Sequence, residues 1–172
     1  MAASKEVVVR RIAVDDGPLL RQVRLAAIAD SPGVFTSTLE QAESHDAHHW
    51  ESAAFANATG GTEATFFAEA DGAVVGMLGA YTMTGGIVTL VGLWSGPGYR
   101  DVGVADALLD SLGEWATRSG ARQLRLWVLE RNEHARRFYE GRGFVATGQT
   151  MPYELDSSIL EMEMTCDLPA QE

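Results

Sequence analysis

The stretch WSGPGYRDVGVA, residues 94–105, connects a run of apolar residues to an amphipathic helix that begins near Asp106. This order of strand, glycine-bearing loop and helix predicts an anion-binding site, because the first N–H groups of a helix have no partners within the helix. These groups carry roughly half a positive charge, and the small residues Gly103 and Ala105 let a phosphate come close to the backbone. The stretch therefore indicates a loop that wraps a pyrophosphate, with an ordinary glycine-rich turn as the alternative.

The spacing within the loop separates it from two common nucleotide-binding motifs. The sequence contains neither G-x-x-x-x-G-K-[ST] nor G-x-G-x-x-G. Instead, Arg100-x-x-Gly103-x-Ala105 resembles the R/Q-x-x-G-x-G/A signature of the GNAT superfamily, which comprises acetyl-CoA-dependent N-acetyltransferases.

A second segment carries the same resemblance. The strand-like run 124–128 is followed by NEHARRFYEGRGF, residues 132–144, which is similar to the N-x-x-A-x-x-x-Y-x-x-x-G-F helix of that family. Asn132 and Tyr139 are about two helical turns apart, so both lie on one face and can contact one ligand. The alternatives are a core aromatic whose hydroxyl meets a carbonyl, for Tyr139, and a helix N-cap, for Asn132.

Length and composition are typical of a soluble globular chain. Its 172 residues predict one domain over residues 1–172, and a hydrophobic content of 46% excludes disorder. No apolar run approaches the roughly 20 residues of a membrane helix, and the N-terminal residues do not resemble a signal peptide. The single cysteine, Cys166, allows no intrachain disulfide, as expected for a cytoplasmic protein. The net charge of −11 argues against a nucleic-acid partner and mildly favours a cationic acceptor.

The order of elements matches the mixed α+β fold of the GNAT family over nearly the whole chain. The resemblance implies a central twisted sheet of about seven strands, flanked by about four helices, with splayed parallel strands at the cofactor site. We expect strands at 6–12, 65–70, 74–81, 87–94, 124–129, 144–148 and 159–166, and helices at 15–30, 43–57, 106–118 and 132–141. Trp50 and Phe55 are expected to point inward, and Arg24 to stay in water.

The resemblance also implies which residues bind acetyl-CoA. Leu93, Trp94 and Ser95 would pair with the amides of the pantetheine arm, and Asn132 would contact the same arm. Tyr139 would lie near the sulfur as the general acid. The pyrophosphate would lie against the loop residues Arg100, Asp101, Val102, Gly103, Val104 and Ala105.

Several residues depart from the family pattern. Some relatives carry a glutamate where this chain has Trp127, so the base that takes the amine proton is left to Glu130, Glu40, Glu43, Glu154 or a water chain. Asp101 and Asp106 add negative charge near a polyanion, which Arg136, Arg137 and Arg142 would offset at the 3′-phosphate. These departures keep open a second hypothesis, a binding module that recognises acyl-CoA without turnover; an interaction scaffold is a third.

No motif identifies the acceptor. The resemblance implies a small-molecule or peptide amine, bound by residues 31–58 and by a loop at 149–158, and implies homodimers as a common assembly. His45, His48 and His49 have helical offsets that suit a metal, but no further ligand pair completes the set, so we predict no metal site.

Overall fold

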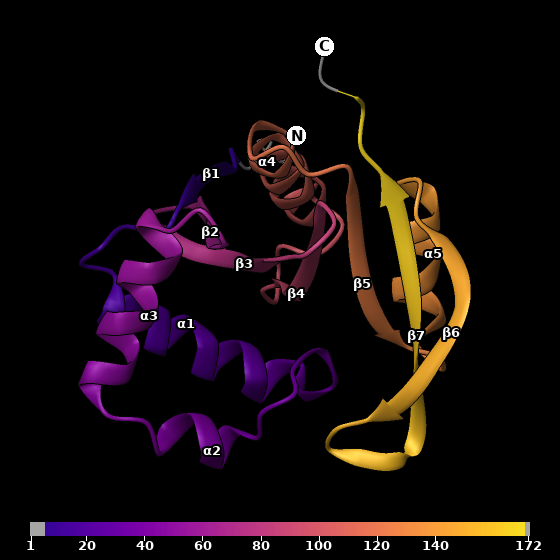
Figure 1. Ribbon diagram of the computed structural model, residues 1–172. Coiled ribbons are helices and arrows are strands. Elements are labelled where there is room, and N and C mark those ends of the chain that lie inside the picture. Colours follow the sequence, from indigo (N-terminus) through magenta and orange to yellow (C-terminus); the bar gives the residue numbers. More distant parts are fainter. Residues whose placement is uncertain (1–5, 171–172) are drawn as a thin grey trace, which may run out of the picture.

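The computed structural model describes residues 6–170, in which one mixed sheet of seven strands has the order β1-β2-β3-β4-β5-β7-β6. The strands β4 and β5 are parallel, and all other neighbours are antiparallel (Figure 1). The mixed α+β sheet of the sequence prediction is therefore confirmed. The strands are β1 (Val8–Arg11), β2 (Glu63–Ala70), β3 (Ala73–Met83), β4 (Ile87–Ser95), β5 (Gln123–Leu129), β6 (Val145–Tyr153) and β7 (Asp156–Asp167).

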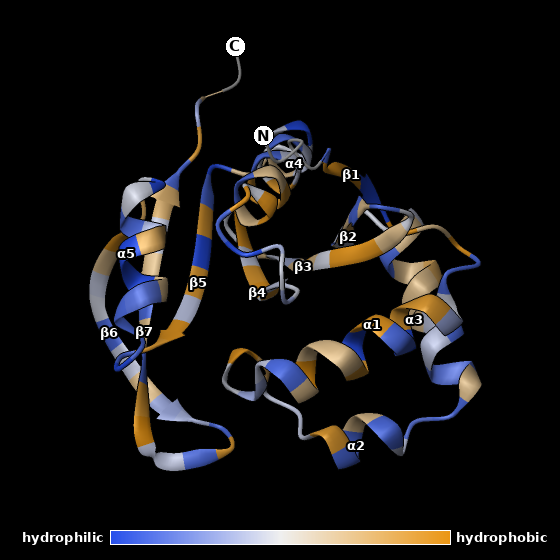
Figure 2. Ribbon diagram, turned by 180° about the vertical axis from the view of Figure 1, so that it is seen from behind, coloured by the Kyte–Doolittle hydropathy of each residue, from blue (hydrophilic) through white to orange (hydrophobic). Residues whose placement is uncertain are grey.

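Two helical layers cover opposite faces of this sheet. Neighbouring residues show the division, because Phe67 and Met77 pack with the first helices while Phe66 and Leu78 pack with α4. Figure 1 shows α1 and α3 on one side of β3 and α4 on the other, and Figure 2 shows that β3 itself is largely hydrophobic. The helices are α1 (Gly17–Asp30), α2 (Leu39–Glu43), α3 (Ala47–Thr59), α4 (Val104–Arg118) and α5 (Glu133–Gly141), with a short 3-10 helix at Pro32–Val34.

The helix after the glycine-bearing loop forms as the apolar spacing predicts. Val104, Leu108, Leu112 and Trp115 are all buried against the sheet. The helix begins two residues earlier than expected, at Val104, because Gly103 adopts a left-handed conformation with φ of 87° and serves as its N-cap. Val104 and Ala105 therefore belong to the first helical turn.

Two parts of the chain differ from the sequence prediction. The helix expected over 43–57 is α3, which begins later, at Ala47, because Asp46 is its N-cap. A separate short helix, α2, precedes it with Thr38 as its N-cap, and this gives five α-helices rather than about four. Phe55 is 61% exposed and does not point inward, whereas Trp50 is buried as predicted. Residues 149–158 are not a loop, because they lie mostly in the hairpin of β6 and β7.

The two parallel strands separate after a short paired region. Only three residue pairs join β4 to β5, and the last is Thr89 with Arg125. Beyond it, the facing edges of residues 90–95 and 126–129 have no ladder between them, although β4 stays paired with β3 and β5 with β7. The predicted splay is therefore confirmed, and it opens the middle of the sheet.

Candidate functional site

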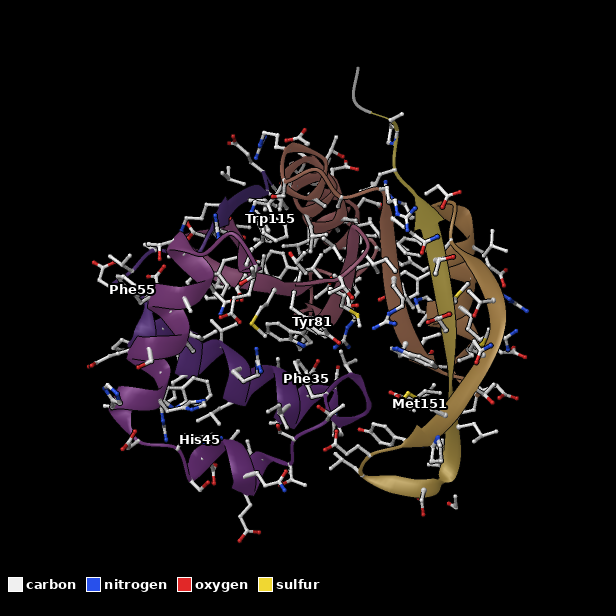
Figure 3. The ribbon with its side chains drawn as sticks, viewed as in Figure 1. Phe35, His45, Phe55, Tyr81, Trp115 and Met151 are labelled. Carbon is white, nitrogen blue, oxygen red and sulfur yellow. The ribbon has the colours of Figure 1, made fainter. Side chains whose placement is uncertain are left out.

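A large cavity occupies the opening between β4 and β5. Its volume is about 1370 Å³, and its walls come from both separated strands, the loop after β4, the start of α5, the segment after α1 and the β6–β7 hairpin. Figure 3 shows three of the lining side chains, Phe35, Tyr81 and Met151, which come from three different parts of the fold. The cavity reaches residues of both helical layers, because α1 contributes Arg24 and α4 contributes Val104, Ala105 and Asp106.

A bulge in β4 shapes the inner edge of the opening. The pairing of β3 with β4 shifts between Met77 and Gly79, so that Gly92 and Leu93 together stand opposite Leu78. Gly92 has φ of 66°, and a Cβ atom there would lie 2.9 Å from the Phe35 ring. Only glycine fits this position, and the ring of Phe35 therefore lies directly against the exposed edge of β4.

The facing edges can pair with an extended ligand. Residues 93–95 and 126–129 line the cavity, and their inner backbone groups lack strand partners on this side. Such groups hydrogen-bond readily to the amides of a chain laid between them.

The loop before α4 contains residues in the left-handed conformation and leads to the first N–H groups of the helix, which have no partners within the helix. Asp101 and Gly103 have φ of 63° and 87°, and a Cβ on Gly103 would meet nothing within 4 Å. Successive turns of this kind form concave sites for anions, and the helix N-terminus adds its dipole. All the predicted loop residues except Val102 line the cavity; Val102 is 45% exposed.

Arg100 lines the cavity but is already held by the protein. Its guanidinium forms an ion pair with Asp30, at the end of α1, and Nε donates to the carbonyl oxygen of Ser95 at 3.2 Å. The indole Nε1 of Trp94 donates to the same Asp30 carboxylate at 2.9 Å. These two donors lower the pKa of Asp30 below its ordinary value, with the Trp94 hydrogen bond as the larger cause. The contacts fix the end of β4 and the loop to the end of α1.

Asn132 and Tyr139 line the same cavity, as their spacing predicts. Asn132 is the N-cap of α5, where its Oδ1 accepts from the N–H of Ala135 at 3.1 Å, so Nδ2 stays available to a ligand. The Tyr139 hydroxyl makes no hydrogen bond with residues 6–170, and burial raises its pKa. Its ring packs against Phe138 and Phe144, with centroids 5.4 and 5.6 Å away.

The charges around the loop are partly balanced. Arg142 binds Asp106 at 3.3 Å and Asp110 at 2.5 Å, so the carboxylate nearest the start of α4 has a cationic partner. Arg137 lies 3.8 Å from Glu133, and Arg136 donates to the carbonyl oxygen of Glu130 at 3.1 Å.

Two carboxylates of the hairpin line the cavity. Trp127 lines the wall, and of the acids named from the sequence only Glu154 does so, since Glu40, Glu43 and Glu130 lie outside it. A further acid, Glu161 on β7, is half-buried in the wall, and burial raises its pKa, with Glu154 adding to the effect. The alternation of residues 160–164 could have identified Glu161, because it places Glu161 and Glu163 together on one face of the strand.

Arg24 also lines the cavity, which contradicts its predicted exposure to water. The prediction failed because the apolar stripe of α1 gives no sign of the wall formed by Phe35, over which the Arg24 guanidinium lies at 5.5 Å.

Two of the three histidines pack as aromatic rings: His49 belongs to α3, and His45 lies in the turn before that helix. His45 and His49 stack at 3.7 Å, and Trp50 meets both edge-on. Among residues 6–170, no three His, Cys, Asp or Glu side chains gather in a way that would hold a metal ion. None of the helices in the same range combines the length and apolar character that a membrane crossing requires.

Comparisons with known proteins agree on one family. Residues 27–144 match the family model described as Acetyltransferase (GNAT) family. An acetyltransferase of the GNAT family from Streptococcus pneumoniae is 23% identical, with a TM-score of 0.79, 95% of this chain and 100% of that chain covered. The protein yncA from Salmonella typhimurium, whose structure holds acetyl-CoA, is 16% identical, with a TM-score of 0.76 and coverage of 97% and 96%.

A third solved structure, nourseothricin acetyltransferase, is 25% identical over a smaller region. It covers 63% of this chain and 66% of its own, with a TM-score of 0.59. A comparison with curated protein sequences finds no match.

Proposed function

Because this chain belongs to the GNAT acetyltransferase family and is an acyltransferase, we propose that it transfers the acetyl group of acetyl-CoA to a primary amine of a small molecule. One observation carries the proposal: β4 and β5 separate beyond Thr89 and Arg125, and the anion-binding start of α4 stands at the same opening. An amide-bearing arm fits between the strands, and a pyrophosphate fits the loop.

The backbone of the loop supplies most of the phosphate contacts in this proposal. Arg100 is neutralised by Asp30, so the N–H groups of residues 103–105 carry the attraction, with Asn132 Nδ2 as a donor to the cofactor arm. Leu93, Trp94 and Ser95 line the cavity, and their backbone groups would contact the pantetheine arm. Acetyl-CoA supplies an activated thioester when bound.

Tyr139 acts as the general acid. Its hydroxyl faces the cavity without a partner among residues 6–170, and its raised pKa keeps the proton in place at neutral pH. The hydroxyl gives its proton to the sulfur as the C–S bond breaks, which is worth on the order of a hundredfold in rate. Glu161 takes the proton that the amine nitrogen loses as the C–N bond forms, because it is the half-buried carboxylate of the cavity wall.

Residues 1–172 are proposed as a single catalytic domain, placed in the cytoplasm on the basis of its lone cysteine, Cys166. A small-molecule acceptor is preferred to a peptide because the similar nourseothricin acetyltransferase is named for a small molecule.

The test combines binding with turnover. Calorimetry should detect saturable binding of acetyl-CoA, and a thiol-release assay with a panel of amines should detect transfer. Binding without thiol release from any amine would support the second hypothesis, an acyl-CoA-binding module.

A pair of variants tests the loop. Gly103→Ala and Gly103→Glu carry the same backbone strain at φ of 87°, but only glutamate fills the open space and adds negative charge. Gly103→Glu should abolish acetyl-CoA binding, while Gly103→Ala keeps most of it. Equal affinities in the two folded variants would overturn the loop assignment.

A further inference from the structure

Arg24 is a half-buried cation in the wall of the cavity, and it has no partner among residues 6–170. Its Nε atom is fully buried and has no hydrogen bond, and the guanidinium makes no hydrogen bond or ion pair with residues 6–170. The other arginines of the cavity wall are paired, Arg100 with Asp30 and Arg125 with Glu163. Arg24 therefore differs from Arg100 and Arg125 because its charge has no ion-pair partner among residues 6–170.

The surroundings of Arg24 make this unpaired charge costly. Burial lowers its pKa, and no carboxylate of the described residues offsets the effect. Its nearest aromatic contact, the ring of Phe35, offers only a weak cation–π interaction at 5.5 Å. An unpaired guanidinium in a water-poor site is unfavourable, and an anionic ligand that enters the site would remove the penalty.

Arg24 and the phosphate loop come from different helical layers. Arg24 belongs to α1, which packs on the sheet face opposite α4 (Figure 1). Phe35 connects Arg24 with β4, since its ring lies 5.5 Å from the Arg24 guanidinium and also packs against the bulge at Gly92 on the inner edge of the strand. Arg24 and the exposed edge of β4 therefore contact the same ring.

The β6–β7 hairpin contributes the opposite charge to the cavity wall. Glu154 and Glu161, from the β6–β7 hairpin, line the cavity and influence each other. Tyr153 of the same hairpin donates to the carbonyl oxygen of Phe35 at 2.5 Å, which holds the hairpin against the segment beside Arg24. The cavity wall therefore offers a ligand both a cation, from α1, and carboxylates, from the hairpin.

We propose that the acceptor is a small amine that carries a carboxylate, such as an amino acid, and that Arg24 binds this carboxylate while the amine faces Glu161. The inference rests on the proposed acetyltransferase function and adds the class of acceptor to it. A guanidinium recognises a carboxylate through two parallel hydrogen bonds, so Arg24 would orient the acceptor as well as attract it.

Matched acceptors test the proposal. Each amino acid is compared with its own carboxamide, in which the amine is kept and the negative charge is removed. With the wild-type enzyme, kcat/KM should be about 100-fold higher for the acid, as expected when a charged hydrogen-bond partner is lost from a buried site. Arg24→Met should remove this preference, and Arg24→Lys should keep part of it.

Two controls separate ligand binding from a structural role. Arg21→Gln changes an exposed arginine of the same helix and should leave the preference unchanged. Arg24→Met should keep acetyl-CoA affinity and the thermal midpoint, because methionine packs on Phe35 and removes a charge that has no partner. A clear fall in the midpoint would assign Arg24 a structural role and overturn the proposal.

The remaining outcomes distinguish the inference from the function on which it rests. If acids and carboxamides react equally well and Arg24→Met changes neither, the inference is wrong and the acetyltransferase function stands. If no amine of either kind releases thiol although acetyl-CoA binds, the proposed function is wrong and the inference is overturned with it.

Discussion

Tyr139 owes its proposed role to a hydroxyl that the fold leaves without a partner. Tyr139→Phe should lower kcat by about 100-fold and leave acetyl-CoA affinity nearly unchanged, because the hydroxyl matters when charge develops on sulfur. The ring contacts with Phe138 and Phe144 are retained, so the thermal midpoint should hold. Steady-state kinetics, calorimetry and thermal unfolding check the three expectations.

Each other outcome for Tyr139→Phe has a definite meaning. Unchanged turnover would show that Tyr139 is not the acid. Equal losses of binding and turnover would assign it to positioning of the cofactor, and a large loss of stability would support a role as a core aromatic.

If Glu161 is the base, kcat/KM should depend on pH in a specific way. A base acts in its deprotonated form, and burial together with Glu154 raises the pKa of Glu161, so kcat/KM should rise with pH through this raised value. Glu154→Gln removes the neighbouring charge and should move the rise to lower pH. Glu161→Gln should abolish it.

Glu130→Gln serves as the matched control, since Glu130 is exposed at the end of β5 and outside the cavity. Its pH profile should equal that of the wild type. If Glu161→Gln leaves the pH dependence of kcat/KM unchanged, Glu161 is not the base, and a water chain would take that role.

Residues that belong to a motif could be predicted from the sequence, and the others could not. Asn132 and Tyr139 belong to one helical segment, so their spacing predicts that they lie on one face of it, and the loop motif predicts the place of Gly103. All three line the cavity. Arg24 and Glu161 enter the cavity from segments far apart in the chain. Their approach depends on tertiary packing, which no local pattern contains.

At the scale of elements, Asp30 joins α1 to the end of β4. Its carboxylate accepts from Trp94 Nε1 at 2.9 Å and pairs with Arg100. Asp30→Asn should lower the thermal midpoint by a few degrees at neutral pH. The native pKa of Asp30 is lowered, so its contribution is present above the unfolded pKa of about 4 and is lost as pH falls below it.

The difference between Asp30→Asn and the wild type should therefore shrink in acid, which thermal unfolding at several pH values measures. Asp15→Asn is the control, because Asp15 is exposed and has no partner among residues 6–170. A difference that persists unchanged at low pH would exclude the carboxylate as its cause.

The helices and strands differ in how well they could be predicted from their own residues. The amphipathic helix α4 was predicted correctly, since a buried face restricts residue type along a helix. Strand β6 is exposed along nearly its whole length and shows no apolar alternation, so its extension to Tyr153 was missed. Its pairing with β7, rather than its own composition, makes it a strand.

For the whole molecule, the order of strands and helices was enough to predict a mixed sheet with a parallel crossover. The crossover from β4 through α4 to β5 is the usual way to place parallel strands side by side. The extent of the separation between them could not be read from the sequence, because it is set by hydrogen bonds that are absent between distant segments.

Only three residue pairs join the two halves of the sheet across its middle, so few backbone hydrogen bonds hold them together there. The amide protons along the free edges of β4 and β5 should exchange with deuterated water faster than those of the β2–β3 ladder, since little holds the two halves together there. Acetyl-CoA laid in the gap would take the place of the missing ladder, so its binding should slow exchange on both edges at once and raise the melting temperature with ligand concentration. Bound acetyl-CoA would then connect the two halves of the sheet, and release of coenzyme A after each turnover would separate them again.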